Sequence, residues 1–185
     1  MKRIFFLAGA LLTLVFSAVA ADDGALRVHL TGYQETPSTI NTAGSGEFRA
    51  RISQDGTAID YELTYQNLSS APTQSHIHFG RPALTGGIVL YLCTNLTPPA
   101  GVPTPQACPT TNPATISGTL TAADVVSQPT QGIDSGAAGF AEMITAIRHG
   151  SAYVNVHTTN HPSGEIRARL GGHDHGHDHD REHHH

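Results

Sequence analysis

The strongest constraint on the fold of this chain is a period-two alternation of apolar and polar residues that recurs in short segments. It is clearest over Ile59–Tyr65, where Ile, Tyr, Leu and Tyr alternate with Asp, Glu and Thr. Successive side chains of a β-strand point to opposite faces, so such a segment has one apolar face and one polar face. Just before it, Gln54–Thr57 contains Asp-Gly, which favours the tight turn of a β-hairpin. The pattern predicts strands that cover a core on one side.

Similar short segments follow one another along the chain, separated by Gly and Pro turns. The pattern predicts an all-β fold, an antiparallel Greek-key-like β-sandwich or barrel of immunoglobulin-like or superoxide-dismutase-like type, with one or two short helices. The helices are expected at Thr121–Val126, with Thr121 as N-cap and Asp124 three residues on, and at Ala137–His149, before Gly150. Strands are expected at Leu26–Leu30, Phe48–Ile52, Ile59–Tyr65, around His76 and His78, and at Ile88–Leu92, Ile116–Leu120, Ala152–His157 and Glu165–Leu170.

The first twenty residues have the pattern of a secretory signal peptide. Lys2 and Arg3 precede the apolar run Ile4–Phe16, and small residues end the segment at Ala20. We therefore expect cleavage after Ala20, a periplasmic or secreted location, and a single β domain over residues 21–170. No later segment is apolar enough to span a membrane, so no membrane contact is expected after cleavage.

Charge and cysteine content limit the partners and the compartment. After Lys2 the chain has no lysine, and it carries 15 Asp and Glu residues in all, which argues against nucleic acid as a partner. Cys93 and Cys108 flank a proline-rich loop, and an exported chain meets oxidising conditions, so we expect a disulfide between them. A thiolate metal site is the alternative, but the spacing does not match common zinc motifs. The sequence leaves a homodimer open and identifies no protein partner.

Four histidines stand in two close pairs, His76/His78 and His157/His161. On a strand, His76 and His78 would point to one face while Ile77 and Phe79 point to the other. Tyr153, Asn155 and His157 would share a strand face, and His161 would follow in a turn. Neutral imidazoles from both pairs could bind Cu(II) or Zn(II); tetragonal geometry would favour copper and tetrahedral geometry zinc. A hydrogen-bonded cluster that becomes charged at mildly acidic pH is the alternative without metal.

The C-terminal residues 171–185 form a histidine-rich, metal-binding tail that we expect to be disordered, because they offer no apolar side chain to bury. An expression tag is another reading of this tail, although its histidines alternate with Asp and Gly. Auxiliary metal ligands are expected there at His173, His175, His177 and His179.

Two motifs resemble a known family. SHIHFG at Ser75–Gly80 and VNVHTTNHPSGEIR at Val154–Arg167, together with LTGYQETP and SGTLTAADV, resemble the CHRD domain, named after chordin. The resemblance extends from Leu26 to Leu170. It implies an exported single-domain protein of bacterial type, and it implies a fold more firmly than a function.

A weaker resemblance concerns the metal site. An H-x-H strand with two further histidines resembles the copper site of Cu/Zn superoxide dismutases, without their zinc loop. It implies a copper-only site with His76, His78, His157 and His161 as ligands, and an arginine such as Arg81, Arg148 or Arg167 to guide an anion.

These observations predict an exported copper-binding protein for storage, buffering, delivery or electron transfer, with zinc as the alternative metal. No catalytic residue is assigned, and a non-enzymatic role is favoured. A copper-only superoxide dismutase-like enzyme is the first alternative, because an open coordination position could support redox chemistry. An extracellular protein-binding or matrix module without an essential metal is the second.

Overall fold

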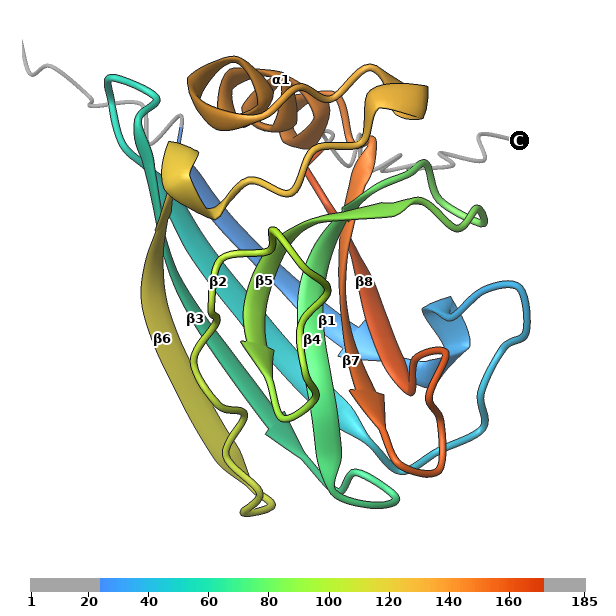
Figure 1. Ribbon diagram of the computed structural model, residues 1–185. Coiled ribbons are helices and arrows are strands. Elements are labelled where there is room, and N and C mark those ends of the chain that lie inside the picture. The colour runs from blue at the N-terminus through green and yellow to red at the C-terminus, as the bar shows by residue number, and fades with distance from the viewer. Residues whose placement is uncertain (1–23, 172–185) are drawn as a thin grey trace, which may run out of the picture.

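A computed structural model describes residues 24–171 as one antiparallel sheet of eight strands, curled into a nearly closed barrel (Figure 1). The all-β prediction is confirmed. The predicted signal peptide with its cleavage site after Ala20, and the tail ligands His173, His175, His177 and His179, lie outside the described residues. The strands are β1 (Ala25–Thr31), β2 (Ser45–Ile52), β3 (Ala58–Gln66), β4 (Pro72–Phe79), β5 (Gly87–Thr94), β6 (Ala114–Thr121), β7 (Ala152–Thr158) and β8 (Ile166–Leu170).

The order of the strands in the sheet is β5-β4-β7-β8-β1-β2-β3-β6. Four of the seven connections join strands that are neighbours in the sheet, namely β1–β2, β2–β3, β4–β5 and β7–β8, and the other three join strands at distant positions in it. The two halves meet where β1 pairs with β8, through the single register pair Thr31 and Arg167. The phenol of Tyr61 on β3 reaches across to β5, a strand at one end of the sheet, and donates to the carbonyl of Leu92, 2.9 Å away.

A segment of the long β5–β6 loop fills the remaining seam between β5 and β6. The Gln106 carbonyl accepts from the backbone N–H of Thr94 at 2.9 Å, and the Gln106 side-chain amide donates to the carbonyl of Ser117 on β6 at 3.1 Å. The predicted disulfide is confirmed: Cys93 and Cys108 are bonded with an S–S distance of 2.06 Å. It fastens the seam segment to β5, so an otherwise open sheet edge is covered.

Helix α1 (Gly136–Arg148) covers one end of the barrel (Figure 1). It matches the predicted helix within one residue at each end, and it is followed by Gly150 in the left-handed region with φ 64°. Its buried side chains, which include Phe140, Met143 and Ile147, join the barrel core. Residues 24–171 also contain three short 3₁₀ helices: η1 (Gly32–Gln34), η2 (Ala122–Asp124), with the predicted capping box of Thr121 and Asp124, and η3 (Pro129–Gln131).

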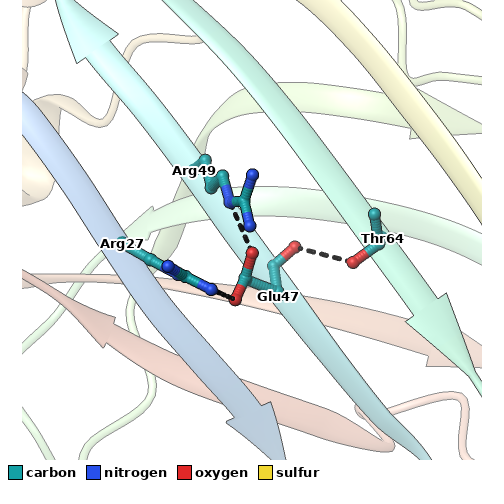
Figure 2. A network of polar contacts seen from close by, with 4 residues as sticks. All are labelled: Arg27, Glu47, Arg49 and Thr64. Carbon is teal, nitrogen blue, oxygen red and sulfur yellow. Dashed lines mark hydrogen bonds and ion pairs between the residues drawn. The ribbon is translucent and has the colours of Figure 1, made fainter.

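The outer face of β1–β3 is the polar face that the period-two pattern predicts (Figure 2). There Glu47 of β2 accepts from Arg27 of β1 at 2.8 Å and pairs with Arg49 of its own strand at 2.5 Å. Exposed ion pairs contribute little to stability, so the stability of these strands comes mainly from the apolar side chains buried on their inner face. Among residues 24–171, no helix has the length and apolar character needed to cross a membrane.

Candidate metal centre

The register of β4 against β7 sorts their side chains into two faces. Ile77 and Val154 lie opposite each other and belong to the core, so the residues directly before and after each of them on its strand face outward from the barrel. His76 pairs in register with Asn155, and His78 with Tyr153. This is the arrangement that the H-x-H spacing predicts for β4 and the alternation predicts for β7. It places the histidines on the outer face of the sheet, opposite to the core.

Three of the four candidate histidines come together. His76, His78 and His157 each offer a ring nitrogen, and the chosen nitrogens all lie within 4.8 Å of one another. The ring centroids of His76 and His157 are 4.9 Å apart, and those of His76 and His78 are 5.3 Å apart. Two segments far apart in the sequence therefore contribute to one cluster, which we call the three-histidine cluster.

His161, the fourth histidine of the sequence prediction, is not part of this cluster. It lies half-buried in the turn between β7 and β8, where its backbone shapes the turn. Its carbonyl accepts from the N–H groups of Thr158 and Gly164, and its own N–H donates to the Thr158 hydroxyl. The turn instead directs the carbonyl of the next residue, Pro162, toward the ring of His157.

Backbone carbonyls orient two of the three rings. Nδ1 of His78 lies 3.0 Å from the carbonyl of Gly86, and Nδ1 of His157 lies 2.9 Å from the carbonyl of Pro162. A carbonyl only accepts, so each Nδ1 carries the hydrogen and each Nε2 keeps its lone pair. Both Nε2 atoms lie 3.1 Å from Oδ1 of Asn155. Proteins commonly orient a metal-binding histidine by a hydrogen bond at the ring nitrogen that does not bind the metal, and the bonds of Nδ1 to the Gly86 and Pro162 carbonyls are of this kind.

His76 differs from the other two. Its side chain is 0% exposed, and neither ring nitrogen has a hydrogen-bond partner among the described residues. Its ring packs edge-on against Tyr91, with centroids 4.5 Å apart. Because buried polar groups nearly always have a partner, this imidazole requires an explanation beyond packing.

The surroundings keep the cluster neutral. Burial lowers the pKa of His76, and the neighbouring His157 and His78 lower it further. Burial also lowers the pKa of His78 to about 4, against the opposing effect of the Gly86 carbonyl. The pKa of His157 is lowered by burial, with the Pro162 carbonyl acting in the opposite direction. Neutral imidazoles at physiological pH are the form that binds a metal ion.

A second polar group lies beside the cluster. Tyr153 stacks on His78 with centroids 4.5 Å apart, and the guanidinium carbon of Arg167 lies 3.4 Å from the Tyr153 ring centroid. Arg167 also donates to the Thr36 hydroxyl and to the Leu84 carbonyl. It is 3% exposed and its donors are engaged inside the protein, so this arginine is not placed to guide an anion from solvent.

Glu165 serves a different purpose from the one its sequence position suggests. As a neighbour of the histidine motif it reads as a partner of an imidazole or of an arginine. In the structure its carboxylate instead accepts hydrogen bonds from the hydroxyls of Thr42, Ser69 and Thr158 and from the Ser69 N–H. It therefore joins three loops at one end of the barrel and contributes no donor to the three-histidine cluster.

Sequence reasoning placed Asn155 on the face of His157 but gave it no role, and it missed Tyr91 and Glu35 as neighbours of this region. The alternation that places Asn155 beside His157 does not show that its amide oxygen lies between two imidazoles. Tyr91 lies in a continuous apolar run, where nothing marks one residue as a neighbour of His76. Glu35 is 5% exposed beside Arg167, and its Oε1 has no hydrogen-bond partner among the described residues.

Comparison with known proteins supports the family and nothing narrower. Neither the curated proteins nor the solved structures gave a significant match to this chain. The sequence model of the CHRD domain matches residues 26–170, which include every strand except the first residue of β1 and also include the three-histidine cluster. The chain therefore belongs to the CHRD domain family.

Proposed function

We propose that this protein is an exported copper-binding protein whose folded domain holds one ion through His76, His78 and His157. The observation that carries the proposal is the buried imidazole of His76, which has no hydrogen-bond partner for either nitrogen. Leaving a buried polar group unpaired costs about 1–3 kcal/mol. A metal ion bound by this ring would supply a partner for one of its two nitrogens, and a hydrogen-bonded histidine cluster supplies none.

The geometry supports the proposal without large rearrangement. Metal–imidazole bonds of about 2.0–2.1 Å allow ligand nitrogens up to about 4 Å apart around one ion. The three candidate nitrogens lie within 4.8 Å of one another, so the rings need to move by less than about 1 Å. His78 and His157 already direct their unprotonated Nε2 atoms to a common point near Asn155.

Copper is the ion we favour. The cluster contains neutral nitrogen donors and no carboxylate or thiolate, since Glu165 is engaged elsewhere and both cysteines are in the disulfide. Imidazole suits Cu, Zn and Ni, and Cu(II) has the highest affinity of the divalent first-row ions for such donors. Zinc remains the alternative metal.

The two other functional classes have less support. A dismutase needs a route for superoxide, but Arg167, which lies over the ring of Tyr153 beside the cluster, is buried and donates to Thr36 and Leu84. A protein-binding module needs an exposed apolar surface, but the large exposed apolar side chains within residues 24–171 are Tyr33, Leu84 and Leu96, from three separate loops. Storage, buffering, delivery and electron transfer are all compatible with a buried single-ion site.

The test compares copper binding by full-length protein and by variants with equal numbers of histidines removed. His76→Leu with His157→Gln should abolish one tight Cu(II) site in a chelator competition titration and remove the imidazole nitrogen hyperfine structure of that site from the EPR spectrum. The matched control, His29→Ala with His149→Ala, removes two histidines outside the cluster and should leave the tight site intact. Equal affinity and equal spectra in both variants would refute the proposal, because binding would then reside elsewhere.

A further inference from the structure

Asn155 occupies the position at which the three-histidine cluster converges. It lies at the middle of β7, between β4 and β8, opposite His76 on one side and Arg167 on the other. Its side chain is 2% exposed, and its Oδ1 is 3.1 Å from Nε2 of both His78 and His157. An amide so placed either competes with an ion for the two nitrogens or binds the ion with them.

The positions of the hydrogens on the two imidazoles distinguish these two roles of Asn155. Nδ1 of His78 and Nδ1 of His157 donate to the carbonyls of Gly86 and Pro162, so in neutral rings both Nε2 atoms are acceptors. A carbonyl oxygen of Asn155 between them is a third acceptor, and no hydrogen is left for either contact. Charging both rings would place two cations in rings whose centroids are 6.4 Å apart inside a buried cluster, which is unfavourable.

Two arrangements satisfy all three groups. In the first, the Asn155 amide is turned over, so that its NH₂ donates to both Nε2 atoms and no ion is needed. In the second, the oxygen stays where it is and a cation lies among the oxygen and the nitrogens. The terminal torsion of asparagine is soft, and its O and N have nearly the same shape, so the amide can pass from one arrangement to the other in place.

We propose that Asn155 is the fourth ligand of the copper site, in the place that the sequence assigns to His161, and that its amide turns over when the ion binds. This inference rests on the proposed function, since it requires an ion at the three-histidine cluster. The resulting donor set is three neutral nitrogens and one neutral oxygen. In the metal-free protein the NH₂ group of the same residue bonds the two imidazoles and holds them in place.

The design of the experiment separates this inference from the proposed function. Asn155→Asp keeps the shape of the side chain and gives the ligand a full negative charge, whereas Asn155→Leu keeps the size and removes the donor. The control, Asn67→Asp, adds the same charge at an exposed position after β3. Each full-length variant is titrated with Cu(II) against a competing chelator, and its Cu(II) EPR spectrum is recorded.

We expect Asn155→Leu to weaken the tight site by about 10–100-fold, which is the loss typical of removing a supporting group at a metal site. Asn155→Asp should strengthen Cu(II) binding at least tenfold and shift the EPR parameters, while Asn67→Asp should match the wild type. Should Asn155→Leu fold poorly, Asn155→Asp and NMR of the wild type still decide. The side-chain NH₂ of Asn155 should exchange slowly in metal-free protein and lose that protection when Zn(II), used as a diamagnetic probe, is added.

Suppose that both Asn155 variants keep the wild-type Cu(II) affinity and EPR spectrum while His76→Leu loses the tight site. That result would overturn the role of Asn155 and leave the proposed function unaffected. No effect of His76→Leu on copper binding would overturn both, because the cluster itself would then not hold the ion.

Discussion

Glu35 is a buried carboxyl group whose titration should make the folded domain less stable as the pH rises. Burial raises its pKa from 4.5 to about 7, although Arg167 and the Thr36 N–H act in the opposite direction. Between these two pH values the folded state keeps a proton that the unfolded state has lost. Because the folded state binds more protons, the free energy of unfolding falls with increasing pH over this window.

The size of the effect follows from the same two values. At about 1.4 kcal/mol per pH unit, the interval from 4.5 to about 7 corresponds to about 3 kcal/mol of stability lost by pH 8. Glu35→Gln keeps the shape of the protonated side chain and removes the titration. The variant should therefore match the wild type at pH 4.5 and exceed it by up to about 3 kcal/mol at pH 8.

The assay is urea unfolding of the metal-free protein at several pH values between 4.5 and 8, with a chelator present. The difference between variant and wild type is the quantity to plot, because the buried histidines also change stability with pH. Their pKa values are lowered, so they destabilise the fold as the pH falls below about 6.5, opposite in sign to Glu35. Subtraction removes this shared contribution.

Glu165→Gln is the matched control, since it makes the same substitution at another buried carboxyl group. Burial acts to raise the pKa of Glu165, but hydrogen bonds from Thr158, Thr42 and Ser69 outweigh it, and the pKa is lowered. This variant should be less stable than the wild type at pH 8, with the difference shrinking as the wild-type carboxylate is protonated in acid. If Glu35→Gln and Glu165→Gln changed stability in the same direction at pH 8, the assignment of their opposite surroundings would be wrong.

Four further predictions concern single sites. In the presence of chelator, His76→Leu should raise the free energy of unfolding by about 1–2 kcal/mol, because an unpartnered imidazole is replaced by an apolar side chain; a loss of stability would mean that His76 has a partner without metal. Replacing Cys93 and Cys108 by serine should cost about 3 kcal/mol in urea unfolding, as expected for a loop with a sequence separation of 15, and little change would show that the seam holds without it. Tyr61→Phe should cost about 1–3 kcal/mol by removing the bond to the Leu92 carbonyl and the bond accepted from the Gln106 amide, whereas an unchanged midpoint would show that these bonds do not help to close the barrel. Gly164→Ala should cost at least about 2 kcal/mol in thermal unfolding, since φ is 126° and a Cβ would lie 2.6 Å from Oε1 of Glu35; a neutral result would contradict both the backbone strain and the steric contact.

The strands could be predicted because their information is local. Alternation in Ile59–Tyr65 and the Asp-Gly turn before it predict β3 and its hairpin with β2, and the structure pairs Ile52 with Ile59 across that turn. Closure of the barrel could not be predicted in this way. It depends on Tyr61 reaching Leu92, 31 residues away, and on Gln106 bonding to both ends of the sheet, and neither contact leaves a periodic trace in the sequence.

The candidate site likewise contains parts that local sequence rules predict and parts that they do not. The H-x-H motif predicts that His76 and His78 share a face, and the alternation on β7 predicts that His157 and Asn155 share a face, because both rules act within one strand. His161 lies in a turn, where the direction of a side chain depends on backbone bonds such as those of its carbonyl to Thr158 and Gly164. Spacing alone cannot predict those bonds, so the structure was needed to show that His161 lies outside the three-histidine cluster.

The position of the cluster on the outer face of the sheet has a consequence for how stability and binding are related. The inner faces of β4 and β7 bury Ile77, Val154 and Val156 in the core, so the strands do not depend on the histidines to hold together. The same backbone register nevertheless fixes both faces, since a slip of one residue would exchange His76 with Ile77. Core packing therefore positions the imidazoles, whereas the identity of the outer-face side chains is not fixed by the core. On this argument, exchanging outer-face residues such as Asn155 should change the affinity for metal far more than the fold, whereas Ile77→Ala should weaken both together.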